Sequence, residues 1–263
     1  MEGQKRMELP ATNWFDDEEY WSANRHFIWS EKRIEMSAIA AERISTLLEM
    51  KPGESVLDLA CGFGRHSIPL AKLGFNVTGI DLNQSFIKEA SEKANEQGLT
   101  AKFECVDMRK FKKPEKFENV IITYNSFGYF ENPNDDRIVI RNCYQSLKPG
   151  GKLLLQDVTR EWIATHRTSK VSRYWFENSD GSIRLEETSA NDDWTWNTTR
   201  WILIKGSERR EYTYGMRIYS AAEYIDLLSS EGFENPQSFG GFSGKSYEED
   251  KDHLILVVEK PKR

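Results

Sequence analysis

The fold of this chain is decided by the stretch Val56-Leu57-Asp58-Leu59-Ala60-Cys61-Gly62-Phe63-Gly64, together with residues 77–81, Val-Thr-Gly-Ile-Asp. A short apolar strand runs into a glycine-rich turn, and a second strand then ends on an acidic residue, Asp81. Because glycine has no Cβ, the backbone at Gly62 and Gly64 can adopt unusual dihedral angles and lie directly against a ligand. A carboxylate at the end of the second strand can accept hydrogen bonds from both hydroxyls of a ribose. The pair of features therefore predicts a site for a nucleoside cofactor.

The details of the turn favour S-adenosylmethionine over a dinucleotide. A dinucleotide fingerprint needs a third small residue, so that the helix packs closely with pyrophosphate at its N-terminus. Here the turn continues as Arg65-His66-Ser67, and the chain contains no Gly-x-x-x-x-Gly-Lys-Ser/Thr phosphate loop. Asp58, on the first strand, would repel a pyrophosphate but suits the ammonium group of a methionine moiety. An ordinary strand–turn–helix corner remains the alternative.

Further acids fall at the ends of later strands. Cys105-Val106-Asp107-Met108 ends a third strand, where Asp107 can accept from an adenine amino group and the Met108 thioether can cover the ring. Residues 120–125 indicate a fourth strand that opens into a polar, aromatic loop, and residues 147–151 end a helix before a fifth strand that finishes at Asp157. Ligands bind along the carboxyl edge of open α/β sheets. We therefore expect Asp58, Asp81, Asp107 and Asp157 to lie along one edge.

Strands and helices alternate as far as Asp157, with helices expected over 65–73, 84–97 and 135–147. This alternation predicts an α/β fold, a Rossmann-like doubly wound sheet of seven strands. An aromatic, acidic segment (residues 1–29) and a helix capped by Ser30 precede the sheet. That helix carries one apolar face: Ile34, Ala38, Ala41, Ile44 and Leu48.

After Asp157 the pattern changes to short strands at 182–189, 194–204 and 209–219, which indicates an antiparallel β insertion after strand five. A capping box, Ser220 with Glu223, then starts a helix to Ser230, and residues 253–259 supply a final strand. We expect four segments: an N-terminal helical cap segment (1–50), the cofactor-binding core (51–158), the insertion (159–219), and a C-terminal helix and strands that complete the sheet (220–263).

The insertion carries Trp194, Trp196 and Trp201. An exposed tryptophan-rich sheet marks an interface, so the insertion is expected to form either a cap over the cofactor edge or the surface of a homodimer. The alternative is that these tryptophans fill the seam between insertion and core.

Composition narrows the classes of function. Lys and Arg total 36 against 42 Asp and Glu, which gives a net charge of −6, so no nucleic-acid partner is expected. No segment of about 18 apolar residues and no signal-peptide pattern is present, so we expect a cytoplasmic protein without a membrane partner. The 3 cysteines have no Cys-x-x-Cys spacing, which predicts reduced thiols and no metal site.

With these segments in view, the sequence resembles the class I S-adenosylmethionine-dependent methyltransferases, and is most similar to a bacterial and archaeal group of small-molecule type. The resemblance spans nearly the whole chain and rests on residues 14–20, 58–66, 77–81, 124–130, 147–151, 160–162 and 217–220. It implies S-adenosyl-L-methionine as cofactor and S-adenosyl-L-homocysteine as product. The Asn/Asp-Pro-Pro-Tyr tetrad of enzymes that methylate adenine, cytosine or glutamine nitrogen is missing, which argues against DNA or protein-glutamine substrates.

The resemblance also implies roles for individual residues. Asp58 through Gly64 would wrap the methionine end, Asp81 would hold the ribose, and Asp107 with Met108 would frame the adenine. Tyr124 and Asn125 would lie under the sulfonium. Together with the neighbours of these motifs, the expected cofactor-binding residues are Asp58, Ala60, Cys61, Gly62, Gly64, Arg65, Asp81, Leu82, Asp107, Met108, Tyr124 and Asn125.

Methyl transfer is an in-line displacement, so the protein must align nucleophile, carbon and sulfur. Aromatic faces stabilise the cationic sulfur, and Tyr124, Tyr20 and Trp14 are the candidates. With Trp14 and Tyr20, the residues expected to bind the acceptor are Tyr129 and Asp157. If the acidic cluster at 16–19 lines the entrance, it favours a cationic or amine acceptor.

No general base stands out in the sequence. The weak catalytic candidates are Tyr124, His26, His166 and Asp157, and a structural role is the alternative for each. We expect a methyltransferase acting on nitrogen or oxygen of a small metabolite. The alternatives are a tRNA or protein methyltransferase, and a cofactor-binding regulatory protein without transfer activity.

Overall fold

A computed structural model of the chain describes residues 14–28, 31–167, 169–177, 181–250 and 252–262. Its core is a seven-stranded sheet with strand order β10-β11-β5-β4-β1-β2-β3. The strands are β1 (Ser55–Leu59), β2 (Asn76–Asp81), β3 (Lys102–Cys105), β4 (Phe117–Ile122), β5 (Leu147–Asp157), β10 (Glu234–Gly240) and β11 (Leu254–Glu259). β1 to β5 are parallel, while β11 pairs antiparallel with β5 and with β10. The doubly wound seven-stranded fold expected from the sequence is confirmed.

Helices cover both faces of this sheet because its strands are apolar on both sides. In β4, Val120 and Ile122 pack in the cluster that contains α5 (Pro133–Ser146) and α7 (Ala221–Ser230). Ile121 points the opposite way, into the cluster of α2 (Glu31–Leu47) and α3 (Ser67–Lys72). The alternation is the two-residue period of a strand. α4 (Gln84–Glu96) contacts β2 and β3 and begins at the N-cap Asn83.

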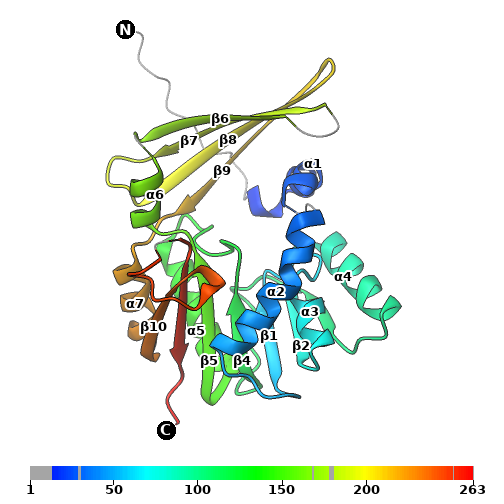
Figure 1. Ribbon diagram of the computed structural model, residues 1–263, viewed down its shortest axis with the longest axis vertical. Coiled ribbons are helices and arrows are strands. Elements are labelled where there is room, and N and C mark those ends of the chain that lie inside the picture. Colours follow the sequence, from blue (N-terminus) through cyan, green and yellow to red (C-terminus); the bar gives the residue numbers. More distant parts are fainter. Residues whose placement is uncertain (1–13, 29–30, 168, 178–180, 251, 263) are drawn as a thin grey trace.

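The second sheet lies beyond the carboxyl edge of the first (Figure 1). It is antiparallel, with order β6-β7-β8-β9: β6 (Val171–Glu177), β7 (Ile183–Ala190), β8 (Trp196–Lys205) and β9 (Glu208–Arg217). We call it the cap sheet. The helix α6 (Arg160–His166) leads into it, and η1 (Trp14–Asp16) and α1 (Glu18–Ile28) lie between the cap sheet and the core.

Three details differ from the sequence-based expectation. The cap sheet has four strands rather than three, because β6 is an edge strand whose exposed side chains give no alternating signal. Residues 147–151 belong to β5 from its start, where Leu147 pairs with Phe117, instead of ending a helix. In α2, Ile34 is 51% exposed and Ala38 is also exposed, so only Ala41 and Ile44 of the expected apolar face are buried within the helix, and Leu48 is buried just past its end. Ser30, the expected cap, lies outside the described residues. The capping box of α7, Ser220 with Glu223, is confirmed.

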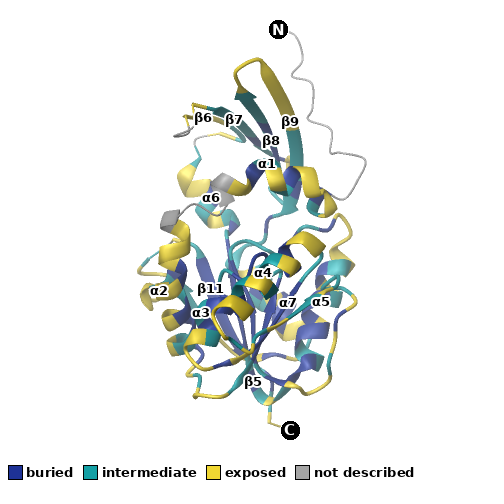
Figure 2. Cartoon of the chain, turned by 90° about the vertical axis from the view of Figure 1, so that its right-hand side faces the viewer, coloured by how far each residue is buried: buried dark blue, intermediate teal, exposed yellow. Residues whose placement is uncertain are grey.

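An aromatic seam joins the cap sheet to the core. The indole nitrogen of Trp14 donates to the carbonyl of Gly215 in β9 at 3.0 Å. Tyr20 of α1 stacks on Trp201 of β8, with ring centroids 5.8 Å apart. Trp201 is therefore buried in this seam, whereas the edge strand β6 (labelled in Figure 2) carries the exposed aromatic side chains Tyr174, Trp175 and Phe176.

A buried carboxyl group ends β5. Asp157 accepts the hydroxyl hydrogen of Tyr224 from α7 at 2.7 Å and the backbone N–H of Val158 at 2.7 Å. Burial outweighs these hydrogen bonds and raises the pKa of Asp157 to about 7. The pair fixes α7 to the carboxyl end of β5.

This buried acid makes stability depend on pH. Its pKa is raised on folding, so the stabilisation is complete below the ordinary value of 3.8 and is lost as pH rises through about 7. Asp157→Asn keeps an oxygen for Tyr224 and removes the titration. In urea unfolding measured at pH 5, 6, 7 and 8, the unfolding free energy of Asp157→Asn should fall with rising pH by about 1–3 kcal/mol less than that of the wild type. The exposed control Asp226→Asn should retain the wild-type slope, and an unchanged slope in Asp157→Asn would contradict the assignment.

Candidate active site

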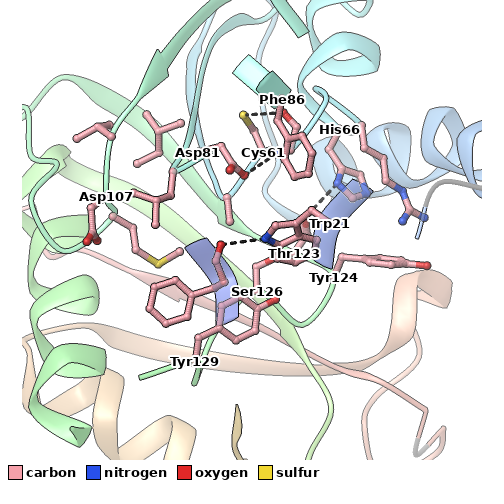
Figure 3. A pocket seen from close by; sticks show the side chains of 18 of the residues that line it. Trp21, Cys61, His66, Asp81, Phe86, Asp107, Thr123, Tyr124, Ser126 and Tyr129 are labelled. Atoms are coloured by element: carbon pink, nitrogen blue, oxygen red, sulfur yellow. Dashed lines mark hydrogen bonds between the residues drawn. The ribbon is translucent and has the colours of Figure 1, made fainter. Parts of the chain in front are cut away.

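A cleft opens at the carboxyl ends of the parallel strands, on the side that faces α1 and the cap sheet. It encloses about 920 Å³, including space open to solvent. Figure 3 shows its side chains, which come from the ends of β1, β2 and β4, from the segment after β3, and from the N-terminal segment. The lining residues are Phe15, Trp21, Ala60, Cys61, Gly62, Arg65, His66, Ile80, Asp81, Leu82, Phe86, Val106, Asp107, Met108, Thr123, Tyr124, Ser126, Tyr129 and Phe130.

The turn after β1 brings bare backbone to the cleft. Gly62 and Gly64 have φ values of 54° and 79°, in the left-handed region that favours glycine. A third glycine, Gly79 in β2, supports the turn from below, because a Cβ there would lie 2.8 Å from the Cys61 sulfur. The turn can therefore sit close to β2 only with glycine at this position.

Asp81, at the end of β2, is tied to this turn. Its two carboxylate oxygens accept the backbone N–H groups of Gly62 and Asn83, each at 2.9 Å. Burial raises its pKa in spite of these bonds. Since each carboxylate oxygen has two acceptor positions, Asp81 retains acceptor capacity toward the cleft that it lines.

Asp107 reaches the cleft already paired. Arg109 binds its carboxylate through Nη2 at 2.6 Å and through Nε at 3.0 and 3.1 Å to the two oxygens. Burial acts to raise the pKa of Asp107, but the Arg109 hydrogen bonds outweigh it and hold the pKa below its usual range. The carboxylate is therefore fixed in orientation and ionised at neutral pH.

The segment after β4 has a strained backbone and is fixed by side-chain hydrogen bonds from β5 and from the turn after β1. Tyr124 and Asn125 have φ values of 63° and 58°, which non-glycine residues rarely adopt. The Tyr124 N–H donates to the side chain of Gln156 at 3.1 Å, and the Thr123 hydroxyl lies 3.0 Å from Nδ1 of His66. Burial, with a smaller contribution from Arg65, lowers the pKa of His66 to about 3, so this imidazole is neutral at physiological pH.

Arg65 stacks on the neighbouring ring. Its Cζ lies 3.6 Å from the centre of the Tyr124 ring. Nε and Nη1 of Arg65 are buried and have no hydrogen-bond partner among the described residues. A buried guanidinium with open donors lining a cleft is suited to an anionic group.

Aromatic side chains form the other wall of the cleft: Phe15, Trp21, Tyr129 and Phe130. The indole nitrogen of Trp21 donates to the carbonyl of Phe15 at 2.9 Å (Figure 3). Phe15 in turn packs edge-on against Phe130 at 5.4 Å. Of this wall, only Tyr129 was expected from the sequence. Phe15, Trp21 and Phe130 were missed, because the sequence gives no sign of which rings turn toward the cofactor edge.

The structure separates the expected cofactor residues into two groups. Nine line the cleft: Ala60, Cys61, Gly62, Arg65, Asp81, Leu82, Asp107, Met108 and Tyr124. Asp58, Gly64 and Asn125 do not. Asp58 is buried behind the turn, where it accepts from the Ser67 hydroxyl at 2.6 Å and anchors the start of α3. Burial raises its pKa to about 7.

Some of the expected acceptor-binding and catalytic residues line the cleft and others do not. Tyr129 and Tyr124 line the cleft, whereas Trp14 and Tyr20 pack behind the wall in the aromatic seam. Asp157 is turned toward Tyr224. His166 is exposed and stacks on Trp162 at 4.1 Å. The side chain of His26 lies outside the described residues.

Within the described ranges, no three His, Cys, Asp or Glu side chains gather where they could hold a metal ion. None of the helices in the described part of the chain is long and apolar enough to cross a membrane.

Comparison with known proteins agrees with this geometry. A family profile described as a methyltransferase domain matches residues 56–151. The chain is 34% identical over 124 residues to the ubiquinone biosynthesis O-methyltransferase of Coxiella burnetii (strain Dugway 5J108-111), a match that covers 47% of this chain and about half (52%) of that protein. It is 25% identical over 227 residues to the glycine/sarcosine N-methyltransferase of Halorhodospira halochloris, covering 82% of this chain and 79% of the relative.

A solved structure shares the fold. An S-adenosylmethionine-dependent methyltransferase from Clostridium acetobutylicum ATCC 824 superimposes with a TM-score of 0.73 at 17% identity, over 92% of this chain and 98% of the other. The family, fold and cofactor expected from the sequence are confirmed. Residues 56–151 carry a methyltransferase domain, and the chain has the class I fold of S-adenosylmethionine-dependent methyltransferases.

Proposed function

We propose that the chain methylates a nitrogen or oxygen atom of a small metabolite that enters the cleft beside Tyr124 and Tyr129. The observation that carries this proposal is the lining itself, which joins an aromatic wall to a row of polar groups and offers no effective base. His66 has a pKa of about 3, and burial raises the pKa of Tyr129. The acceptor must therefore present a nucleophilic atom that is already unprotonated, such as a neutral amine or a readily ionised oxygen.

The residues present fit S-adenosylmethionine, and two observations support this. The Nε and Nη1 donors of half-buried Arg65 have no hydrogen-bond partner among the described residues and suit an anion, and the bare backbone of Gly62 lines the cleft. We assign Asp81 to the ribose hydroxyls, Asp107 and Met108 to the adenine, and Arg65 to the cofactor carboxylate. When bound, S-adenosylmethionine supplies an electrophilic methyl group, whose carbon–sulfur bond breaks toward sulfur as the acceptor lone pair forms the new bond.

The protein contributes positioning and exclusion of water. The aromatic wall keeps the reacting centre dry, and alignment of this kind can lower a barrier by roughly 7–11 kcal/mol. The Tyr124 ring is fixed by its strained backbone and by the Arg65 guanidinium that lies over it, so it serves as a rigid part of the wall beside the reacting centre. The proton of an amine acceptor leaves to solvent, because His66 cannot take it at neutral pH.

Transfer itself is the direct test of this function. With methyl-labelled S-adenosylmethionine, label should pass to members of a panel of small amines, phenols and carboxylates. The pH dependence of the rate should follow the pKa of the acceptor and show no step from an enzyme histidine. Label found only on tRNA or protein would contradict a small acceptor. Binding of S-adenosylhomocysteine without transfer to any compound would instead support a regulatory role.

The role of Asp81 predicts a loss of affinity. Asp81→Asn removes the negative charge that accepts from the ribose, so the Kd for S-adenosylhomocysteine should rise about 10-fold or more in isothermal titration. The control Asp226→Asn, on α7 and away from the cleft, should bind like the wild type. Wild-type affinity in Asp81→Asn would remove this residue from the cofactor site.

The role of Arg65 predicts a selective effect. Arg65→Met keeps a long side chain over Tyr124 but removes the donors, so S-adenosylhomocysteine should bind about 10-fold or more weakly. S-adenosyl-3-thiopropylamine, which lacks the carboxylate, should bind the variant and the wild type equally. Equal losses for both ligands would show that Arg65 does not bind the carboxylate.

A further inference from the structure

The strand β6 forms one edge of the cap sheet. It pairs with β7 along its whole length, residues 171–177. Among the described residues no second strand pairs with it, and β9 forms the opposite edge (Figure 1). That opposite edge is contacted by the N-terminal segment, since Trp14 donates to the carbonyl of Gly215. An edge strand such as β6 presents a row of backbone N–H and C=O groups with which a further strand can pair.

The side chains along this edge are large, apolar and exposed. Trp175 is 67% exposed, the highest value among the large apolar side chains of the described residues. Tyr174 and Phe176, on either side of it, are also exposed. Edge strands that stay unpaired usually contain lysine, proline or a bulge. β6 contains neither lysine nor proline, and its register with β7 is unbroken, so the edge is suited to pairing.

An apolar row runs from β6 across the outer face of the cap sheet. Trp175 lies opposite Leu185 of β7, and Leu185 lies opposite Ile202 of β8. The neighbouring Trp201 faces the seam with Tyr20, so Ile202 faces outward, because side chains alternate along a strand. A strand added to β6 would lengthen this row and cover Trp175.

The central residues of β6 complement themselves when two copies run antiparallel. They are Arg173-Tyr174-Trp175-Phe176-Glu177. With Trp175 at a two-fold axis, the two Trp175 side chains lie opposite each other, and Tyr174 of each copy lies opposite Phe176 of the other. Arg173 of each copy lies opposite Glu177 of the other, so this ion pair forms twice. Aromatic pairs and opposite-charge pairs both stabilise antiparallel strands.

Neighbouring registers lose this match. With Arg173 or Glu177 at the axis, two like charges lie directly opposite each other, which destabilises a strand pair. With Tyr174 at the axis, Arg173 lies opposite Trp175. With Phe176 at the axis, Glu177 lies opposite Trp175. Within residues 173–177, the axis at Trp175 is therefore the position that satisfies both the charges and the rings.

The charges that would pair across this edge are accessible. The Arg173 guanidinium pairs with Glu187 of β7, yet its side chain is 63% exposed. A guanidinium has five N–H donors and can bind a second carboxylate beside the first. Glu177 ends the strand and is exposed. Arg173 is thus oriented by Glu187 and still open to Glu177 of a second copy.

We propose that the protein is a homodimer in which the β6 strands of two copies pair antiparallel about Trp175. The two cap sheets then form one continuous sheet. A second copy occupies this edge, because the order of charges and rings along β6 matches its own reverse, and a two-fold contact of this kind closes at two copies. Residues 171–177, all of them described, contribute nothing to the lining of the cleft. The interface is therefore separate from the cofactor site.

Charge reversal tests the interface and its register. Arg173→Glu places like charges opposite each other at both ends of the paired strands, and Glu177→Arg does the same. In analytical ultracentrifugation over a range of concentrations, the wild type should form a dimer. Each single variant should dimerise about 10-fold or more weakly. An equimolar mixture of the two variants should recover dimerisation, because each acid then lies opposite an arginine.

Arg200→Glu is the matched control. It reverses the charge of another outer-face arginine that pairs with a glutamate across the sheet, Glu211, but it lies on β8, away from the edge. Its dimerisation should equal that of the wild type. All variants should keep the wild-type circular dichroism spectrum and the wild-type Kd for S-adenosylhomocysteine, which shows that they fold.

Three results would overturn the proposal. The first is a wild-type protein that stays monomeric at every concentration. The second is a dimer that is unaffected by either charge reversal, since the interface would then lie elsewhere. The third is a mixture of the folded single variants that stays monomeric, since the two charges would then not face each other.

Discussion

The structure depends on one short contact, in which the backbone N–H of Gly62 donates to the carboxylate of Asp81. This bond joins the turn after β1 to the end of β2 and sets the floor of the cleft. It is possible because Gly62 tolerates a positive φ and because Gly79 leaves space under Cys61. Backbone donors thereby hold the Asp81 carboxylate in a fixed orientation, and it can still accept hydrogen bonds from the cleft. A carboxylate free on the surface would have no such fixed orientation.

Other elements of the structure enclose the cleft above this floor. Asp107 is locked by Arg109, and Tyr124 is locked by Gln156 and by the stacked Arg65. The N-terminal rings and the cap sheet close the side opposite the strands, since Trp14 bonds to β9 and Tyr20 stacks on Trp201. The groups assigned to the cofactor thus come from the strand ends of the core, whereas the wall beside the acceptor also includes Phe15 and Trp21 of the N-terminal segment. Such a division lets the acceptor site vary while the cofactor site stays the same.

Features set by short sequence patterns could be predicted from the sequence, whereas side-chain orientations set by residues far along the chain could not. The glycine turn, the acid that ends β2 and the α7 capping box are each short sequence patterns, and such patterns predicted the sheet and most of the cleft lining. The orientations of Tyr20 and Asp157 could not be predicted in this way. Tyr20 is turned by Trp201, far along the chain, and Asp157 by Tyr224. The edge strand β6 was not predicted, because an exposed edge strand needs no apolar alternation.

The most direct measurement is a crystal structure of the protein with S-adenosylhomocysteine. The account predicts ribose hydroxyls on Asp81, adenine beside Asp107 and Met108, and the amino acid carboxylate on Arg65. It would be contradicted by a ligand lodged elsewhere, for example in the separate cleft between Arg160 and Arg217, or by side chains that fill the space above Gly62.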